Sequence, residues 1–213
     1  RLQDEKLGVV SPGYFISILE EYNLVHMVDL YVFEEVYKFQ KQLQDEGKRL
    51  LPISVNFSKI TLMYPELLSR VLEISNSYDV PNEFVQIEIT ETVRDMDHVI
   101  VNDIAKRLHN MGFKLLMDDF GARYSNLASF VQFSFDTIKI DRAMVMDIVE
   151  DKKSALVLRH LISMIQDLNV ECVIEGVETR EQVEMLKQMN VHDVQGYFFG
   201  EPIPKEEFYR KVL

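Results

Sequence analysis

Seven polar side chains stand at or near the ends of short apolar segments, and their types suit the binding of a hard metal ion. They are Asn56, Glu88, Asp118, Asp119, Lys139, Glu175 and Gln195. Carboxylate and amide oxygens are the ligands that Mg²⁺ and Mn²⁺ prefer over zinc. Carboxylates that converge without a counter-charge repel one another, and a divalent cation removes that repulsion. Together, these residues could therefore hold such an ion.

The adjacent pair Asp118-Asp119 extends this expectation to two ions. Neighbouring carboxylates could hold two metal ions roughly 3.5–4 Å apart, which is the arrangement used in phosphodiester hydrolysis. Lys139 could position the attacking water or offset the negative charge that develops in the reaction. The residue types alone thus predict a phosphodiester site with divalent metal.

Each of these residues also has a plain structural explanation. Asn56 could be a turn residue and Glu88 a solvated edge residue. The two aspartates could cap a helix turn, and Lys139 could pair with Asp141 or with a helix C-terminus. Glu175 and Gln195 stand before glycines and could be loop residues. One site explains the six positions more simply than six coincidences do.

The elements that must position these residues alternate along the chain. Short apolar segments predict strands at 51–56, 84–89, 113–118, 137–139, 171–175 and 191–195. Helical spacing or helix-start signals predict helices from 12, over 28–46, 66–78, 97–110 and 154–168, and from 179 and 204, with a short helix before 137. This rhythm predicts an α/β fold with a parallel sheet, and fits both a doubly wound sheet and a (β/α)8 barrel missing two strands. In both folds the polar residues meet at the carboxyl ends of the strands.

Composition narrows the class of protein. The chain has 213 residues, of which 47% are hydrophobic, and its net charge of −12 argues against a surface for a nucleic acid polymer. The apolar runs are too short to span a bilayer. Cys172 is the single cysteine, which excludes an intramolecular disulfide and fits a reducing compartment. The five histidines show no zinc-ligand spacing.

Six motifs in order carry a resemblance to a known family. They are Ser54-Val55-Asn56-Phe57-Ser58, Glu88-Ile89-Thr90-Glu91, Asp118-Asp119-Phe120-Gly121, Lys139-Ile140-Asp141-Arg142, Glu175-Gly176-Val177-Glu178-Thr179 and Gln195-Gly196-Tyr197-Phe198-Phe199-Gly200. Together they resemble the EAL domain family, bacterial phosphodiesterases that cleave cyclic di-GMP to linear pGpG. The resemblance covers the whole chain. It implies a modified TIM-like (β/α)8 barrel with one antiparallel strand.

The resemblance implies a two-metal site for Mg²⁺ or Mn²⁺. Asn56, Glu88 and Asp118 match ligands of one metal ion. Asp119 and Glu175 match ligands of the second ion, and Glu175 also matches a general base.

The remaining roles are implied in the same way. Lys139 matches the lysine that contacts the catalytic water, and Gln195 matches a residue that supports the water or the metal shell. Glu91 matches the glutamate that anchors the loop after the two aspartates. Arg1 and Asp141 match residues that contact the substrate, with Arg1 at a phosphate.

Three departures from the family pattern stand out. The Glu-Ala-Leu tripeptide is absent, so we expect residues 1–213 to form one EAL-like domain truncated at its N-terminus, lacking the first one or two strands and one metal-ligand Glu. Ala122 and Arg123 replace the usual Thr and Gly, which puts activation through that loop in doubt. Glu201 stands where relatives often carry Arg or Lys.

The resemblance also implies partners and a location. It predicts cyclic di-GMP as the ligand, a homodimer, and sensor or cyclase-like domains fused in the parent protein. The predicted location is cytoplasmic, with a membrane anchor possible elsewhere in the parent.

The sequence offers two alternative functions. Asp119-Phe120-Gly121 looks like the magnesium-binding triplet of protein kinases, but the Gly-rich loop and the His-Arg-Asp motif are absent. A catalytically inactive EAL-like domain acting as a cyclic di-GMP receptor or as a regulatory and dimerisation scaffold is the serious alternative. Such proteins generally lose metal ligands, whereas every ligand position within this chain is kept. This favours an active parent protein, with the isolated 213-residue fragment weak or inactive.

Overall fold

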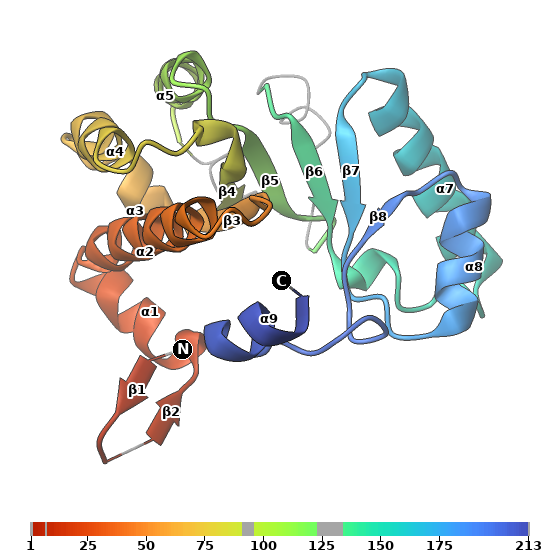
Figure 1. Cartoon of the computed structure of the whole chain (residues 1–213). Coiled ribbons are helices and arrows are strands. Elements are labelled where there is room, and N and C mark those ends of the chain that lie inside the picture. The colour runs from red at the N-terminus through yellow and green to blue at the C-terminus, as the bar shows by residue number, and fades with distance from the viewer. Residues whose placement is uncertain (1, 7, 91–95, 123–133, 213) are drawn as a thin grey trace.

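The computed structural model describes residues 2–6, 8–90, 96–122 and 134–212. Its centre is a sheet of six parallel strands with helices on its outer side (Figure 1). The strands are β3 (Ile53–Phe57), β4 (Val85–Thr90), β5 (Leu115–Phe120), β6 (Thr137–Ile140), β7 (Glu171–Ile174) and β8 (Asp193–Val194).

The order of the strands in the sheet decides between the two expected architectures. The strands lie side by side in the order in which they occur along the chain, from β3 to β8. A doubly wound sheet reverses its strand order at a switch point, whereas a (β/α)8 barrel does not. The fold is therefore the TIM-like one. Within the described residues, β3 and β8 are the two ends of the sheet, and the antiparallel strand that the resemblance implies has no counterpart among these six.

Helices follow the strands and cover them. They are α1 (Pro12–Glu21), α2 (Val25–Asp45), α3 (Lys59–Leu62), α4 (Leu67–Asn76), α5 (His98–Asn110), α7 (Lys152–Asp167), α8 (Arg180–Gln188) and α9 (Lys205–Val212), with 3-10 turns η1 (Asn82–Phe84) and η3 (Arg142–Met144). Several begin where the side chain of a capping residue accepts a backbone N–H. Thr179 and Gln182 form the predicted capping box at the start of α8.

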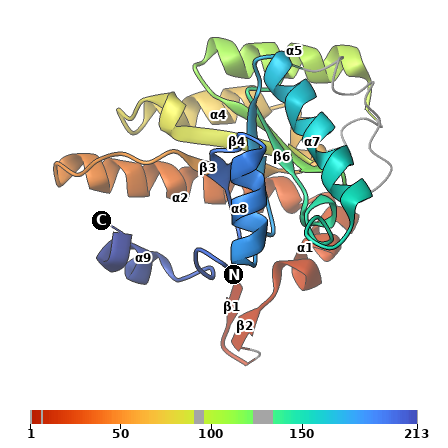
Figure 2. The same ribbon diagram turned by 90° about the vertical axis from the view of Figure 1, so that its right-hand side faces the viewer.

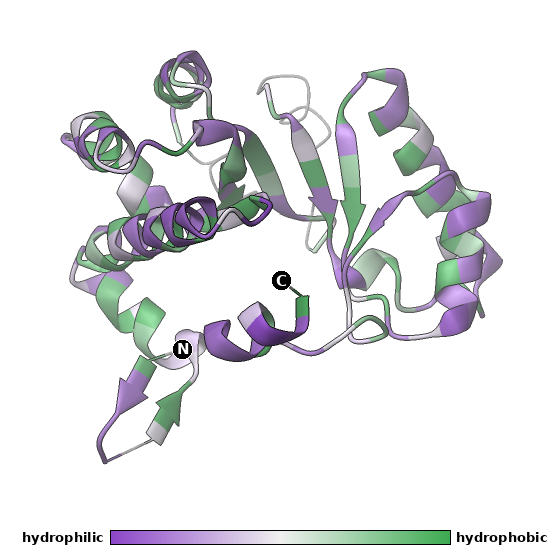
Figure 3. Ribbon diagram, viewed as in Figure 1, coloured by the Kyte–Doolittle hydropathy of each residue, from purple (hydrophilic) through white to green (hydrophobic). Residues whose placement is uncertain are grey.

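Two groups of buried side chains join the helices to the sheet. One lies between α2, α4, α5 and the strands β3 and β4, with the fully buried Phe33 and Tyr37 of α2 in edge-to-face contact. The other lies between α7, α8 and the strands β5 to β8. The hydropathy colouring shows polar residues on the outer helix faces (Figure 3). The apolar helix faces thus hold the sheet, and the carboxyl ends of the strands stay available for polar groups.

The structure shifts some of the expected boundaries. Strand β3 begins after Pro52, which has no N–H to donate to a neighbouring strand. Strand β5 starts at Leu115 and runs on to Phe120, so both aspartates belong to it. Helix α7 ends at Asp167, one residue before the expected end, and Leu168 after it is 52% exposed.

A pair of short strands was not predicted, and for the predicted helix after Pro204 only its contact with α2 is new. A small antiparallel pair, β1 (Leu2–Asp4) with β2 (Gly8–Val10), stands apart from the main sheet (Figure 1). Helix α9 lies against the end of α2, where Tyr209 contacts Glu46 and Lys48 (Figure 2). Across the described part of the chain, every helix is too short or too polar to span a membrane.

Candidate functional site

Lys139 is the centre of a buried charged cluster at the carboxyl ends of the strands. Its Nζ lies 2.9 Å from Glu88 Oε1, 3.0 Å from Asp118 Oδ1 and 2.8 Å from Glu175 Oε1. Glu88 and Lys139 are only 5% and 6% exposed. These four side chains come from β4, β5, β6 and the residue after β7, so the parallel sheet brings together residues far apart in the sequence. Lys139 therefore pairs with these three carboxylates and not with Asp141, which was the structural alternative.

A bulge in β5 lets two adjacent aspartates face one site. In a regular strand, successive side chains point to opposite faces. The register between β5 and β6 shifts between Met117 and Phe120, and Asp119 has a φ of 57°. Bulges of this kind redirect side chains, and a positive φ in a non-glycine residue is a strained conformation often found at functional sites. As a result, oxygens of Asp118, Asp119 and Glu175 lie within 4.8 Å of one another.

The electrostatics of the cluster are unbalanced towards negative charge. Burial raises the pKa of Asp119 above its ordinary value, and the charges of Asp118 and Asp141 raise it further. Burial also raises the pKa of Glu175, although its bond to Lys139 acts in the opposite direction. Burial alone would lower the pKa of Lys139, but the surrounding carboxylates outweigh burial and raise it. The single positive charge of Lys139 therefore does not neutralise the carboxylates around it.

The donor set fits a hard divalent cation. Asp118 Oδ1 is buried and has an ion-pair contact with Lys139 but no hydrogen bond. Asp118 shares that ammonium group with Glu88 and Glu175, so the cluster has room for an additional positive partner. Three carboxylates with oxygens at this spacing could hold a metal ion, and oxygen ligands favour hard ions. The metal would supply the charge that Lys139 alone does not.

Asn56 lies beside this cluster but is not part of its ion-pair network. The register of β3 with β4 places Asn56 opposite Glu88. Its side chain is exposed and borders a hollow between α1, α2 and β3. The Asn56 amide is therefore accessible to a ligand that is held next to Glu88.

Gln195 and Asp141 share a pocket with Glu175 on the other side of the cluster. Asp141 also accepts the N–H of Ala143 at 2.8 Å, so it caps the turn η3 as well. The main chain at Gly176 has a φ of 69°, and a Cβ there would overlap Arg142. Glycine at this position lets Arg142 pack against the loop that carries Glu175. Two expected residues, Arg1 and Glu91, lie outside the described residues, as does Arg123.

Some residues near the site were not singled out from the sequence. Arg142, Glu178 and Tyr197 line the pocket that contains Gln195, and Arg142 pairs with Glu178 at 3.4 Å. Asp29, on α2, is buried beside the hollow that Asn56 borders. An acid between apolar neighbours on a helix is the one sequence signal that could have identified Asp29.

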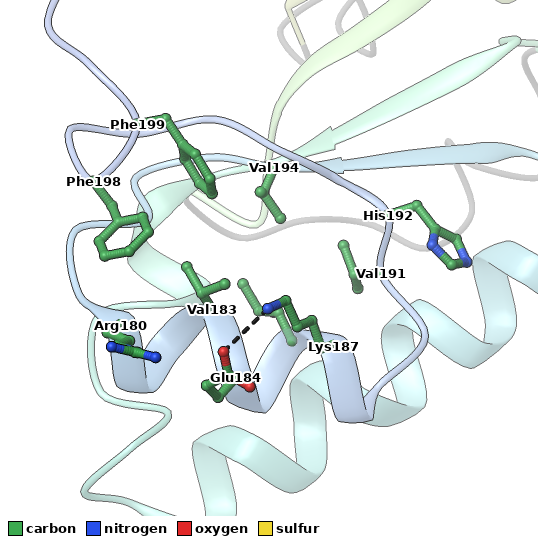
Figure 4. Close-up of a pocket in the computed structure, with 10 residues that line it drawn as sticks. Arg180, Val183, Glu184, Lys187, Val191, His192, Val194, Phe198 and Phe199 are labelled. Carbon is green, nitrogen blue, oxygen red and sulfur yellow. Dashed lines mark hydrogen bonds and ion pairs between the residues drawn. The ribbon is translucent and has the colours of Figure 1, made fainter.

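A different hollow lies between α8 and the turn at Phe198 and Phe199 (Figure 4). Apolar side chains such as Val183 and Val194 line most of it. Its rim carries an exposed ion pair, Lys187 Nζ to Glu184 Oε1 at 3.0 Å. It shares no residue with the carboxylate cluster or with the pocket that contains Gln195, so we do not place the chemistry there.

Comparison with known proteins identifies what the chain is similar to. The family model described as EAL domain matches residues 1–202. The cyclic di-GMP phosphodiesterase RocR of Pseudomonas aeruginosa is 31% identical over 202 residues, which cover 95% of this chain and 51% of RocR. The oxygen sensor protein DosP of Escherichia coli is 32% identical over 210 residues, which cover 97% of this chain and 26% of DosP. The chain thus spans only about a quarter to a half of these relatives.

A solved structure agrees with the fold. The PaMucR phosphodiesterase in its c-di-GMP complex matches with a TM-score of 0.89 at 26% identity. The match covers 98% of this chain and 84% of that one.

Proposed function

This chain belongs to the EAL domain family, and on that premise we propose that the protein hydrolyses cyclic di-GMP to linear pGpG with Mg²⁺ or Mn²⁺. The observation that carries the proposal is the buried cluster in which Lys139 meets Glu88, Asp118 and Glu175 at the strand ends. In TIM-like barrels this face holds the active site. Cyclic di-GMP is the substrate of RocR and the ligand in the PaMucR complex, which supports the choice of substrate.

The residues divide into two ligand sets in this proposal. Asn56, Glu88 and Asp118 would hold one metal ion, and Asp119 with Glu175 would hold the second. The ions would polarise the phosphodiester and increase the acidity of the attacking water. The 4.8 Å limit on the spacing of the Asp118, Asp119 and Glu175 oxygens supports a shared metal site.

The chain's own groups would move the protons. Glu175 accepts a proton from the water as the water oxygen forms a bond to phosphorus. Lys139, whose pKa the surrounding carboxylates raise, stays protonated, orients the water and offsets the negative charge on the phosphoryl group. The P–O3′ bond then breaks, the 3′ oxygen takes up a proton from solvent, and Glu175 returns its proton to solvent, which gives the linear product.

Other residues complete the proposal. Gln195 supports the water or the metal shell, since it shares a pocket with Glu175. Asp141 from that pocket, together with Arg1, contacts the substrate, and Glu91 anchors the loop after the aspartates. The protein would act as a homodimer in the cytoplasm. Fusion to sensor or cyclase-like domains is supported by the oxygen sensor protein DosP and the bifunctional diguanylate cyclase/cyclic di-GMP phosphodiesterase MucR, of which the matched regions cover 26% and 31%.

The test is hydrolysis by the purified full-length parent protein, with Mn²⁺ and with EDTA, followed by chromatography of the nucleotides. We expect pGpG with Mn²⁺ and none with EDTA. Glu184→Gln is a matched control, because Glu184 is a carboxylate outside the site. If cyclic di-GMP binds but is not cleaved, the enzymatic function is wrong and the protein is a receptor. If cyclic di-GMP does not bind, a scaffold role is left.

A further inference from the structure

Asp29 on α2 is a buried acid that contacts the chain just after Asn56. It is 7% exposed. Its Oδ2 accepts the backbone N–H of Ser58 at 2.8 Å and the hydroxyl of Thr61 at 2.5 Å. Ser58 follows Phe57, the last residue of β3. The acid therefore ties helix α2 to the exit of the strand that carries Asn56.

The side-chain hydrogen bonds around Asp29 run in one direction, from Ser58 through Thr61 to the carboxylate. The Thr61 hydroxyl donates to the carboxylate, so it can accept from Ser58 Oγ at 2.9 Å. Ser58 Oγ in turn accepts the N–H of Thr61 at 3.1 Å and caps α3. Burial raises the pKa of Asp29, while its bonds to Thr61 and Ser58 favour the charged form. The turn after β3 is thus held at two points by one carboxylate oxygen.

Strand β3 is one of the two end strands of the described sheet, with β8 at the other end. Among the described strands it pairs with β4 alone, whereas β4, β5, β6 and β7 each have two neighbours. The register with β4 fixes Asn56 opposite Glu88, but on the other side of β3 no strand restrains it within the described residues. Asp29 and Asn56 line the same hollow between α1, α2 and β3.

We propose that Asp29 is a positioning residue that holds Asn56 in place for a metal ion next to Glu88. The proposal rests on the proposed function, because it takes Asn56 as a ligand. Asp29 does not touch the metal or the substrate; it acts through the Ser58 N–H and the end of β3. Residues that orient metal ligands in this way typically contribute 10- to 100-fold to metal affinity.

The first test measures Mn²⁺ affinity by electron paramagnetic resonance, with no substrate present. We expect Asp29→Ala to weaken binding by about 10-fold. In a double-mutant cycle, the same substitution on an Asn56→Ala background should weaken binding by less than about 2-fold, because the group that Asp29 positions is already gone. Ser58→Ala is the matched control: it removes the cap of α3 but keeps the N–H that Asp29 binds, so it should lower stability and leave Mn²⁺ affinity unchanged.

A second measurement needs no metal. Amide hydrogen exchange at Ser58 should speed up by at least about 10-fold in Asp29→Ala, because its N–H loses its buried partner. If that variant fails to fold, Asp29→Asn, which keeps the size and one acceptor oxygen, should show the same changes to a smaller degree.

The outcomes separate the two proposals. Unchanged Mn²⁺ affinity in the Asp29 variants, or equal losses with and without Asn56, would overturn the positioning role and leave the hydrolase intact. A wild-type protein that binds no Mn²⁺ would instead overturn the proposed function itself, and with it the role of Asn56 as a ligand.

Discussion

Strands β5 and β6 carry polar side chains near both of their ends, and the two ends are built in opposite ways. At the amino end, Asp136 Oδ2 accepts the N–H of Leu115 at 2.7 Å and contacts His109 Nε2 at 2.9 Å. At the carboxyl end, Lys139 meets three carboxylates, and Asp118 Oδ1 has no hydrogen bond. In the first arrangement one acid meets two donors of the protein, and in the second three acids share one cation.

The contrast between the two ends fits the division of a TIM-like fold into a stability face and a chemistry face. At the amino ends of β5 and β6, the polar groups satisfy one another. At the carboxyl end, burial raises the pKa of Glu175 and of Asp119, so the protein carries unrelieved repulsion there. Polar groups that a fold leaves unsatisfied are the ones a ligand can satisfy. Four substitutions test this comparison.

Asp118→Asn should have the largest effect on activity. It keeps the size of the side chain but removes a charge that faces Lys139 and a proposed metal ligand. We expect turnover of cyclic di-GMP to fall by more than about 100-fold, beyond the usual range for residues that only support ligands. Stability should not fall, because the repulsion within the cluster decreases. Turnover and urea unfolding check both parts, and turnover within tenfold of wild type would refute the assignment.

Lys139→Met should separate the protein's own counter-charge from that of the metal. Without metal, the buried Glu88 and the partly buried Asp118 and Glu175 lose their shared partner, so the free energy of unfolding should fall by about 3–5 kcal/mol. Added Mn²⁺ should restore part of this stability, since it supplies the missing charge. Turnover should fall while Mn²⁺ binding persists. A collapse of Mn²⁺ affinity would show that Lys139 does not act on the water.

Asp136→Ala should show the opposite pattern at the amino end. The Leu115 N–H loses its partner, so the free energy of unfolding should fall by about 1–3 kcal/mol. Turnover per folded molecule should be unchanged, because Asp136 lies at the start of β6 and not at the site. Urea unfolding and a single-temperature activity assay measure the two quantities. A loss of turnover without a loss of stability would contradict the distinction between the amino and carboxyl ends of β5 and β6.

Lys187→Met should have the smallest effect and sets the baseline. Its side chain is 63% exposed and pairs with Glu184 on the outer surface of α8. Exposed ion pairs contribute at most about 1 kcal/mol, so stability should change by less than that amount. Neither turnover nor Mn²⁺ affinity should change. A larger effect on Mn²⁺ affinity would mean that charge far from the cluster matters, and would weaken the contrast.

The amino-acid sequence predicted the strands of the main sheet and named the candidate residues of the site. Apolar segments with β propensity predicted all six strands of the sheet, and the capping box at Thr179 predicted the start of α8. These are local signals, because periodicity and capping act within a few residues. The motif order also indicated the family that the comparisons then showed.

The way in which these residues come together is apparent only in the three-dimensional structure. The parallel register placed Lys139 among Glu88, Asp118 and Glu175, where the sequence had left pairing with Asp141 equally open. The bulge in β5 and the positive φ of Asp119 turned both aspartates to one site, although alternation along a strand predicts opposite faces. The contact of Asp29 with the turn after β3 joins residues 29 positions apart. Pairings across such separations depend on strand order and packing, which no local pattern specifies.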